Sequence, residues 1–309
     1  MGNDTDKNTS AVEISELTKI FFDFWRRPKV KALDSLSLRI GYGEIFGLLG
    51  PNGSGKTTTI KILLGLLHPT SGFVRVLGGE PSDIKVKSRI GYLPEESYLY
   101  KHLSARETLM FFARLFNFNE NSIRERVDRL LELVDMAHVA NRPVGEFSKG
   151  MARRIGLAQS LINDPDLIIL DEPTSGLDPI ACYKMKNIIK ELGKKGKTII
   201  ISSHLLADIE DLCSRICILY NGRILAQGSL QELLEQEDKI RFSLTVRTAE
   251  EVSKAEAVLK DIFGHEPVID RPRVTLERFF FDIVSRQKQN TERIKEVQST
   301  NQDSCEDDK

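Results

Sequence analysis

The most constraining feature of the sequence is a glycine-rich segment between an apolar run and a helix-forming run. It reads Gly50-Pro51-Asn52-Gly53-Ser54-Gly55-Lys56-Thr57 and follows the apolar residues 45–49. A buried strand that enters such a turn and then a helix can wrap its backbone amides around a phosphate. Lys56 would then reach the β- and γ-phosphates, and the Thr57 hydroxyl would be a ligand for Mg²⁺.

The segment therefore predicts a nucleotide-binding α/β protein, and a chance match to the pattern is the alternative. Apolar side chains at Ile60, Leu63, Leu64 and Leu67 are expected on one face of the following helix. This strand, loop and helix context argues against chance. The residues expected to bind the nucleotide here are Gly50, Pro51, Asn52, Gly53, Ser54, Gly55, Lys56, Thr57 and Thr58.

Length and charge bound the remaining possibilities. With 309 residues, the chain has room for one substantial domain and an appendage, or for two modest domains. Its 44 basic and 45 acidic residues nearly cancel, so no nucleic-acid partner is expected. No apolar run approaches the roughly 20 residues that cross a bilayer, and the first six residues contain no signal-peptide core. These observations predict a soluble protein of the cytoplasm.

The cysteines predict neither a disulfide framework nor a metal centre. There are four, Cys182, Cys213, Cys217 and Cys305, in a long chain. Cys213 and Cys217 have a spacing that would place them on one helical face, but no histidines stand nearby at ligand spacing. Packing positions for both thiols are therefore favoured over a metal site.

The first third of the chain reads mainly as strands. They are expected at residues 12–15, 35–40, 45–49, 73–77 and 89–93. The aromatic cluster Phe21, Phe22, Phe24 and Trp25 follows the first strand and precedes a basic run. Two interpretations stay open for it: one ring stacks on a base, or the rings cover the core beside an edge strand.

Residues 101–164 read as a helical insertion. A capping box at Ser104 and Glu107 opens a helix that runs through Phe116, and Ser122 and Glu125 open a second. The second helix has one apolar face, formed by Ile123, Val127, Leu130, Leu131 and Val134. A third helix is expected to start near Ser148 and to end before Asn163.

The remaining chain returns to strands and then changes character. Wholly apolar runs at residues 167–170 and 198–201 predict buried strands, and Asn221-Gly222 predicts the turn of a hairpin. The expected domains are a disordered lead at 1–11, a nucleotide-binding domain at 12–236 with a helical subdomain at about 97–163, a small αβ domain at 237–285, and a disordered tail at 286–309.

Polar residues at the ends of the two buried strands indicate hydrolysis. Asp171 directly follows an aliphatic run, where it can hold Mg²⁺ through water, and Glu172 can polarise an attacking water. Helix-capping or loop acids are the alternative. His204 follows the next strand and could contact the γ-phosphate, although a lone histidine is more often structural.

Ser148-Lys149-Gly150 forms a second potential anion site at a helix N-terminus. By itself this is only a good helix cap. One chain does not need two sites for the γ-phosphate of a single nucleotide. The second site therefore suits the nucleotide of another subunit.

In order and spacing, these motifs resemble the ATP-binding subunits of ABC transporters over residues 12–235. The motifs are the Gly50 to Thr57 loop, Phe147-Ser148-Lys149-Gly150-Met151, residues 167–173, Ser175-Gly176-Leu177-Asp178, and His204. More narrowly, Ile90-Gly91-Tyr92-Leu93-Pro94-Glu95, the Ser-Lys-Gly-Met form and the short C-terminal part resemble the exporter-type branch. That branch handles drugs, sodium, lipids or polysaccharides, and its membrane subunits are separate chains.

The resemblance implies a head-to-tail homodimer that holds two ATP molecules with Mg²⁺. It implies membrane permease subunits as partners and a cytoplasmic, peripheral position on the inner face of the cell membrane. By the same resemblance, Phe21 stacks on adenine, Ser148 and Gly150 contact the partner's γ-phosphate, and Asp178 lies across the dimer seam. Glu172 is then the general base of ATP hydrolysis, and His204 contacts the γ-phosphate.

The chain departs from the family pattern at two places. Glu95 stands where the family has a glutamine near the metal and the attacking water. A carboxylate can still bind Mg²⁺ or accept a hydrogen bond from water, but its charge could alter coupling to the membrane subunits. Lys149 replaces the first glycine of the signature motif and Met151 replaces its glutamine.

The expected fold is an α/β P-loop NTPase core with a parallel sheet, an antiparallel β subdomain, a helical insertion and a small αβ C-terminal domain. One alternative function is a soluble ATPase of the same family that acts on ribosomes or DNA. Such relatives carry two cassettes or a long coiled coil, and this chain has neither. A nucleotide switch without hydrolysis is a third class, against which Asp171, Glu172 and His204 argue.

Overall fold

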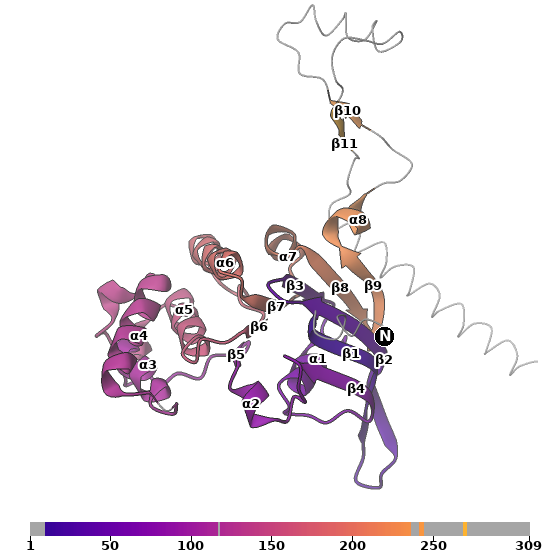
Figure 1. Ribbon diagram of the computed structural model, residues 1–309, viewed down its shortest axis with the longest axis horizontal. Helices are drawn as coiled ribbons and strands as arrows, with labels where there is room; N and C mark the ends of the chain where they lie inside the picture. The colour runs from indigo at the N-terminus through magenta and orange to yellow at the C-terminus, as the bar shows by residue number, and fades with distance from the viewer. Residues whose placement is uncertain (1–9, 117, 236–240, 244–267, 271–309) are drawn as a thin grey trace, which may run out of the picture. The chain divides into compact units, whose positions relative to one another are not determined.

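The computed structural model describes residues 10–116, 118–235, 241–243 and 268–270 (Figure 1). The chain divides into two compact units, Met1–Leu230 and Gln231–Lys309. All of the predicted site residues belong to the first unit. In the second unit, β10 (Arg241–Ser243) and β11 (Val268–Asp270) form an antiparallel pair.

A six-stranded sheet forms the centre of the first unit. Its strands are β3 (Ile45–Leu49), β5 (Ile90–Leu93), β6 (Leu167–Asp171), β7 (Thr198–Ser203), β8 (Arg215–Tyr220) and β9 (Arg223–Ser229). They lie in the order β5-β6-β7-β3-β8-β9, and all neighbours are parallel except β8 and β9. Every residue of β6 and β7 is buried, as their aliphatic runs predict.

This strand order brings three functional segments to one edge of the sheet. Strands β6, β7 and β3 are consecutive neighbours and run in the same direction. The glycine-rich loop follows β3, and His204 follows β7. Asp171 is the last residue of β6, and Glu172 comes directly after it. Because the carboxyl ends of parallel strands meet at one edge, segments far apart in sequence form a single site.

A three-stranded antiparallel sheet covers α1 (Lys56–Leu63), as Figure 1 shows. The sheet consists of β1 (Ser10–Phe22), β2 (Pro28–Gly41) and β4 (Ser71–Val76) in the order β2-β1-β4. Buried residues of α1, of this sheet and of β3 belong to one apolar core, which includes Val12, Leu38, Phe46, Ile60 and Leu63. Helix α1 is therefore packed between the two sheets.

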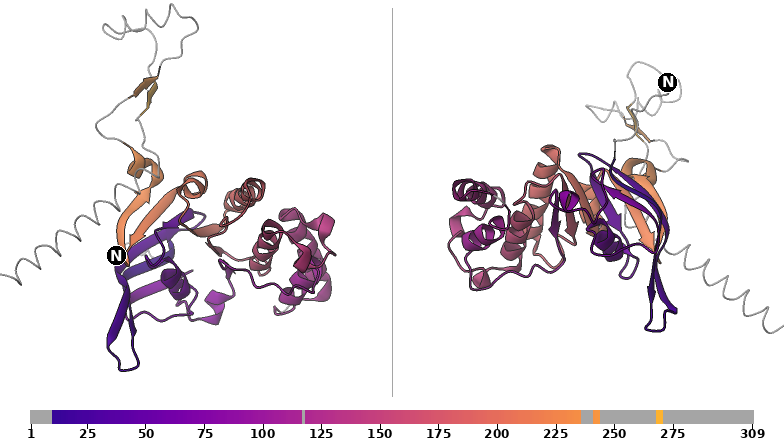
Figure 2. Two further views of the ribbon diagram at one scale, coloured as in Figure 1. Left: turned by 180° about the vertical axis from the view of Figure 1, so that it is seen from behind. Right: turned by 60° about the horizontal axis from the view of Figure 1, so that its bottom comes forward.

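The helical insertion gathers at one side of the parallel sheet, in magenta in both views of Figure 2. It consists of α3 (Ala105–Ala113), α4 (Glu120–Leu133), α5 (Lys149–Ser160) and the 3₁₀ turns η1 (Ala137–Val139) and η2 (Val144–Glu146). The predicted capping box is confirmed: Glu107 N donates to Ser104 Oγ at 3.2 Å, and Ser104 N donates to Glu107 Oε2 at 2.8 Å. The five predicted apolar positions of α4 are all buried.

Four further helices complete the described part of the chain: α2 (Ile84–Lys87), α6 (Pro179–Lys194), α7 (Leu206–Leu212) and α8 (Leu230–Leu234). The sequence interpretation did not include α6 or α7. Asp178 caps α6, since its Oδ1 accepts a hydrogen bond from Ala181 N at 2.9 Å, and Pro179 occupies the first helical position. No helix in the described ranges is long and apolar enough to cross a bilayer.

Three predicted helix boundaries are wrong, for local reasons. Helix α1 ends at Leu63, before Gly65 adopts a φ of 63°, so Leu67 lies outside the helix. Helix α3 ends at Ala113 instead of Phe116. Helix α4 begins earlier than predicted because Asn119, and not Ser122, is the cap: its Oδ1 accepts from Ser122 N at 2.8 Å.

Two cysteines occupy packing positions, as predicted, but they do not share a helical face. Cys213 directly follows α7 and Cys217 lies in β8, and both are buried. Burial raises the pKa of both thiols, that of Cys217 to about 12. Within the described residues, no cluster of three or more His, Cys, Asp or Glu side chains could hold a metal ion.

The predicted domain boundaries at residues 11, 236 and 285 stay predictions. Strand β1 begins at Ser10, inside the predicted lead. The predicted tail at 286–309 lies outside the described residues. Of the predicted αβ domain at 237–285, only Arg241–Ser243 and Val268–Asp270 are described.

Candidate nucleotide-binding site

The glycine-rich loop joins β3 to α1 in a conformation that requires glycine. Gly55 caps α1 with a φ of 110°, in a region that side chains other than glycine avoid. A Cβ atom there would lie 2.7 Å from Leu33 Cδ2 and 2.9 Å from Ala32 O. Gly222 N donates to Ser54 O at 3.0 Å, so the β8–β9 turn is hydrogen-bonded to the glycine-rich loop.

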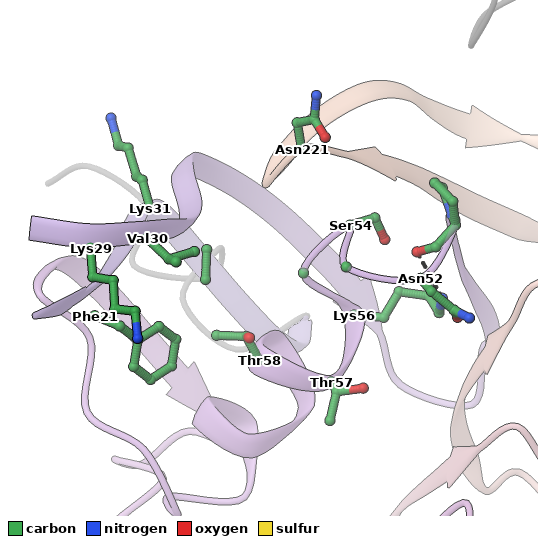
Figure 3. Close-up of a pocket in the computed structure, with 14 residues that line it drawn as sticks. Phe21, Lys29, Val30, Lys31, Asn52, Ser54, Lys56, Thr57, Thr58 and Asn221 are labelled. Carbon is green, nitrogen blue, oxygen red and sulfur yellow. Dashed lines mark hydrogen bonds between the residues drawn. The ribbon is translucent and has the colours of Figure 1, made fainter. Parts of the chain in front are cut away.

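A cavity of about 720 Å³ lies over this loop (Figure 3). Residues of the loop line one part, and the β1–β2 hairpin lines another: Phe21, Lys29, Val30, Lys31, Ala32, Pro51, Asn52, Gly53, Ser54, Gly55, Lys56, Thr57, Thr58 and Asn221. In Figure 3 the Phe21 ring lies on one side of Thr58, and Asn52 and Lys56 lie on the other. The cavity thus offers an aromatic face at one end and the glycine-rich loop at the other.

Five lining residues were not foreseen in the sequence: Lys29, Val30, Lys31, Ala32 and Asn221. They come from β2 and from the β8–β9 turn, which the fold brings beside the loop. Cross-strand pairing of Phe21 with Val30 places β2 next to the predicted aromatic. Pairing of this kind is not visible in the local sequence pattern. Gly50, which opens the loop, does not line the cavity.

Lys56 lies in the centre of the site and is almost fully buried, with 7% of its surface exposed. Its Nζ donates to Gly50 O at 2.6 Å and lies 3.9 Å from Glu172 Oε1. Burial lowers the pKa of Lys56, and the nearby carboxylates of Glu172, Asp171 and Glu95 oppose that shift. The structure therefore places a buried ammonium group between the loop and the acidic residues.

Glu172 connects Lys56 to His204. Its other carboxylate oxygen, Oε2, lies 2.9 Å from His204 Nδ1. Glu172 has a φ of 50°, a left-handed conformation that is strained for a residue other than glycine. Hydrogen bonds from its backbone N to Ser202 O and Ser202 Oγ, each 3.1 Å, hold it there. The ends of β6 and β7 and the start of α1 thus bring Glu172, His204 and Lys56 together.

Asp171 is the last residue of β6 and lies beside this group. Its Oδ1 accepts a hydrogen bond from Ser202 Oγ. Burial raises the pKa of Tyr92 to about 12, with a further contribution from its charge interaction and hydrogen bond with Asp171. Glu95 lies in the loop after β5 and is exposed, so of the predicted metal-binding carboxylates only Asp171 is buried.

The comparison with protein families matches residues 33–175 to the ABC transporter family. An uncharacterized ABC transporter ATP-binding protein of Nostoc is 46% identical over 238 residues, which are 76% of this chain and 71% of that protein. This chain belongs to the ATP-binding subunits of ABC transporters. A Nod factor export ATP-binding protein of Burkholderia pseudomallei is 43% identical over 208 residues, or 66% of this chain and 68% of the relative.

Solved ABC ATPases confirm the predicted P-loop NTPase fold. One is cbiO1 of Clostridium perfringens, part of the ABC transporter complex cbiONQ, with a TM-score of 0.66 and 28% identity over 73% of this chain and 90% of that one. Another is the dimeric cassette MJ0796 in a post-hydrolysis state bound to ADP and Pi, with a TM-score of 0.64 and 26% identity over 71% and 98%. The predictions of an ABC family member and an ATP hydrolase are thereby confirmed.

The residues predicted to contact the partner's ATP or the dimer seam do not line the cavity over the glycine-rich loop of the same chain. They are Ser148, Gly150 and Asp178. Ser148 is exposed and caps α5, with its Oγ accepting from Met151 N at 3.2 Å. Gly150 is buried against α6, where a Cβ atom would lie 2.6 Å from Ala181 Cβ. Asp178 caps α6. The chain therefore presents two separate sets of candidate ATP contacts.

Arg153 is a candidate functional residue that the sequence interpretation missed. It projects from α5, is 4% exposed, and donates to the backbone carbonyls of two loops. Nη1 contacts Pro94 O and, at 2.8 Å, Glu95 O, while Nη2 donates to Asp171 O at 2.6 Å and Glu172 O at 2.9 Å. One guanidinium group thus ties the helix behind Ser148 to the loops that carry Glu95 and Glu172.

Proposed function

We propose that this ABC ATPase works as a homodimer on the cytoplasmic face of the membrane and powers export through separate permease subunits. The Nod factor export proteins support export, and the cbiONQ complex supports separate partner subunits. The dimeric cassette in its hydrolysed state supports pairing of two ATPase chains. Powering of transport by ATP hydrolysis is the family's activity; the direction and the pairing of identical chains are the proposal.

Each ATP is held between two chains in this proposal. The exposed Ser148 and the N-terminus of the 12-residue helix α5 suit an anion, because the first backbone N–H groups of a helix point outward. Ser148, Gly150 and Asp178 do not line their own chain's cavity. Ser148 and Gly150 therefore contact the γ-phosphate at the partner's loop, and Asp178 lies across the seam.

The observation that carries the proposed chemistry is the Lys56–Glu172–His204 arrangement. Glu172 is 6% exposed, and its two carboxylate oxygens face Lys56 at 3.9 Å and His204 at 2.9 Å. A carboxylate held in this way can accept a proton from an attacking water. Lys56 then balances negative charge on the β- and γ-phosphates, and His204 orients Glu172 and contacts the γ-phosphate.

Mg²⁺ fits the oxygen atoms at this site. The Thr57 hydroxyl and the Asp171 and Glu95 carboxylates are hard oxygen donors of the type that Mg²⁺ prefers. Among the described side chains, Ser54 Oγ is buried in the same loop and has no hydrogen-bond partner. Thr57, Asp171 and Glu95 would hold the ion together with the phosphates, and the bound ion would neutralise phosphate charge.

Phe21 is the proposed contact of the adenine base. Its ring lines the cavity and is 38% exposed. Lys19 Nζ lies 5.3 Å from the ring centroid, so it occupies one face of the ring and leaves the other for stacking.

The alternative of a soluble factor that acts on ribosomes or DNA has less support. Helices α3 and α4 of the insertion have 9 and 14 residues, too short for a long coiled coil. The near-neutral net charge of −1 also gives no support to a nucleic-acid partner.

Substitution Glu172→Gln tests the proposed base while keeping the shape of the side chain. ATP binding should remain and steady-state hydrolysis should fall by roughly 100-fold or more, because an amide cannot accept the proton. Size-exclusion chromatography with ATP and Mg²⁺ should then show a trapped dimer. Glu125→Gln, at an exposed position of α4, is the matched control and should hydrolyse ATP at the parent rate. Hydrolysis by Glu172→Gln at the parent rate would refute the assignment.

A further inference from the structure

The β1–β2 hairpin extends beyond the antiparallel sheet to which it belongs. Strand β4 pairs with β1 only from Val12 to Thr18, whereas β1 and β2 stay paired as far as Phe22 and Pro28. The last part of the hairpin is therefore a two-stranded ribbon without a third strand. Figures 1 and 2 show this ribbon projecting away from the rest of the first unit.

The end of the ribbon, residues 22–27, is here called the hairpin tip, and one carboxylate holds it in shape. Asp23 Oδ1 accepts hydrogen bonds from Trp25 N and Arg27 N, both at 2.8 Å. Asp23 Oδ2 pairs with Arg27 Nε at 3.1 Å, and Asp23 N donates to Arg27 O at 2.9 Å. A two-stranded ribbon is marginally stable by itself, so these bonds indicate a preformed tip.

The tip presents aromatic rings to solvent. Phe24 is 93% exposed and Trp25 is 72% exposed, and the two rings contact each other edge to face with centroids 5.5 Å apart. The interpretation that these rings cover the core is therefore wrong. Adjacent large rings exposed on a projecting element indicate a contact surface.

The unpaired charge of the tip is positive. Its single carboxylate, Asp23, is used within the turn and by Arg27. Arg26 makes no ion pair within the described part of the chain. The nucleotide cavity ends at Phe21 and Lys29 on this hairpin, so the rings of Phe24 and Trp25 do not belong to it.

We propose that the hairpin tip inserts Phe24 and Trp25 into the headgroup region of an anionic lipid bilayer. Tryptophan and phenylalanine rings partition into this region, and the cationic Arg26 beside them matches anionic headgroups. A flat membrane surface can reach both rings because the ribbon stands clear of the sheet. This contact goes beyond the proposed transport function and does not depend on the cargo or on the residues that bind ATP.

The tip contains its own reporter, because Trp25 is the only tryptophan of the 309-residue chain. The purified full-length protein is mixed with vesicles of phosphatidylglycerol and phosphatidylcholine, or of phosphatidylcholine alone. Trp25 emission should shift to shorter wavelength with the anionic vesicles, and the protein should sediment with them. Vesicles of phosphatidylcholine alone should bind several-fold more weakly.

Variants separate the tip from other parts of the chain. Phe24→Ser keeps the reporter and should bind anionic vesicles at least about tenfold more weakly, since one buried ring is lost. Arg26→Glu should also weaken binding. Tyr183→Ser removes a ring that is 67% exposed on α6, and it should bind as the parent does. All three variants should retain parent ATP hydrolysis without lipid, which shows that they fold.

The proposal is overturned by any of four results. One is the absence of both the emission shift and sedimentation with anionic vesicles. Another is equal binding by Phe24→Ser and the parent, which would assign the contact elsewhere in the chain. Equal binding to both kinds of vesicle would remove the role of lipid charge. A shift that requires permease in the vesicles would assign the tip to a protein partner. Each can occur while ATP hydrolysis stays normal, so failure here is distinct from failure of the proposed function.

Discussion

At the scale of single residues, Arg153 shows how one side chain can organise several loops. Arginine has five N–H donors in a rigid plane. In Arg153 they face backbone carbonyls and the Ser97 hydroxyl instead of a carboxylate partner. Burial lowers the pKa of Arg153 to about 10, with Asp171 and Glu95 opposing the shift. We infer that Arg153 is a positioning residue for Glu172, because it holds the backbone of the predicted base and does not line the cavity over the glycine-rich loop.

Substitution Arg153→Lys tests this role. A lysine has one nitrogen and cannot reach both loops, so kcat should fall roughly ten- to a hundredfold through misplacement of Glu172. The KM for ATP should change far less. Arg154→Lys is the matched control, since Arg154 is also buried in α5 but donates to Val134 O and Asp135 O, away from the site. Equal loss of kcat in the two folded variants would reduce Arg153 to a structural role.

At the scale of elements, two contacts position the predicted site residues: one between helices α5 and α6, and one between the two sheets. Helix α5 approaches α6 so closely at Gly150 that a Cβ atom would lie 2.6 Å from Ala181 Cβ. The two sheets meet where Asp34 N, on β2, donates to Gly222 O at 2.9 Å and the Asp34 carboxylate pairs with Arg223 on β9. Both contacts lie next to segments that carry predicted ATP contacts.

The α5–α6 contact predicts that Gly150→Ala is harmful because of packing. The added methyl group should destabilise the fold by about 1–3 kcal/mol and lower ATP hydrolysis. Adding Ala181→Gly removes the opposing atom, so the double variant should regain most of the stability in urea unfolding and most of the activity. A double variant that regains stability but stays inactive would show that Gly150 is needed at the phosphate and not for helix packing.

The contact between the sheets predicts a dependence on pH. Hydrogen bonds from Lys31 and Arg223 lower the pKa of Asp34 below its ordinary 3.8. A lowered folded-state pKa means that the contribution is present above the unfolded pKa and is lost as the pH falls through the folded one. Asp34→Asn should therefore destabilise the protein at pH 7 by roughly 1 kcal/mol or less. In urea unfolding, this difference should shrink near pH 3; a constant difference would contradict the ion pair as its cause.

At the scale of the whole molecule, the predicted ATP contacts of one chain do not all line the same cavity. Phe21 and the glycine-rich loop line the cavity, and Ser148 does not. The proposed head-to-tail homodimer resolves this separation, because each ATP then meets the loop of one chain and Ser148 of the other.

A mixing experiment tests this arrangement. Lys56→Ala removes the loop ammonium, and Ser148→Arg blocks the opposing surface, so neither protein alone should hydrolyse ATP above a few per cent of the parent rate. In mixed dimers, one of the two sites combines the intact Lys56 with the intact Ser148. An equimolar mixture should therefore regain measurable ATP hydrolysis. No gain, despite mixed dimers detected by differential tags, would contradict a site shared between chains.

The parts of the fold that were predicted depend on neighbouring residues. Aliphatic runs identified β6 and β7, and glycines followed by Lys56 identified the phosphate-binding loop. Helix α6 was missed although Asp178 and Pro179 form a recognisable helix start, so the signal was present but was read only as part of a motif. Arg153 was missed for a different reason: most of its partners are backbone carbonyl oxygens, which every residue has.

By itself, the sequence determined the family, the phosphate-binding loop and the identity of the acidic pair, because glycine placement, strand burial and helix caps are written in adjacent residues. Only the tertiary structure decided that Lys56, Glu172 and His204 face one another, and that Lys29, Val30 and Asn221 line the cavity. The physical reason is that strand order and cross-strand pairing set distances between residues far apart in sequence. The tertiary structure also decided the exposure of Phe24 and Trp25, because the pairing of β1 with β2 continues beyond the pairing of β1 with β4.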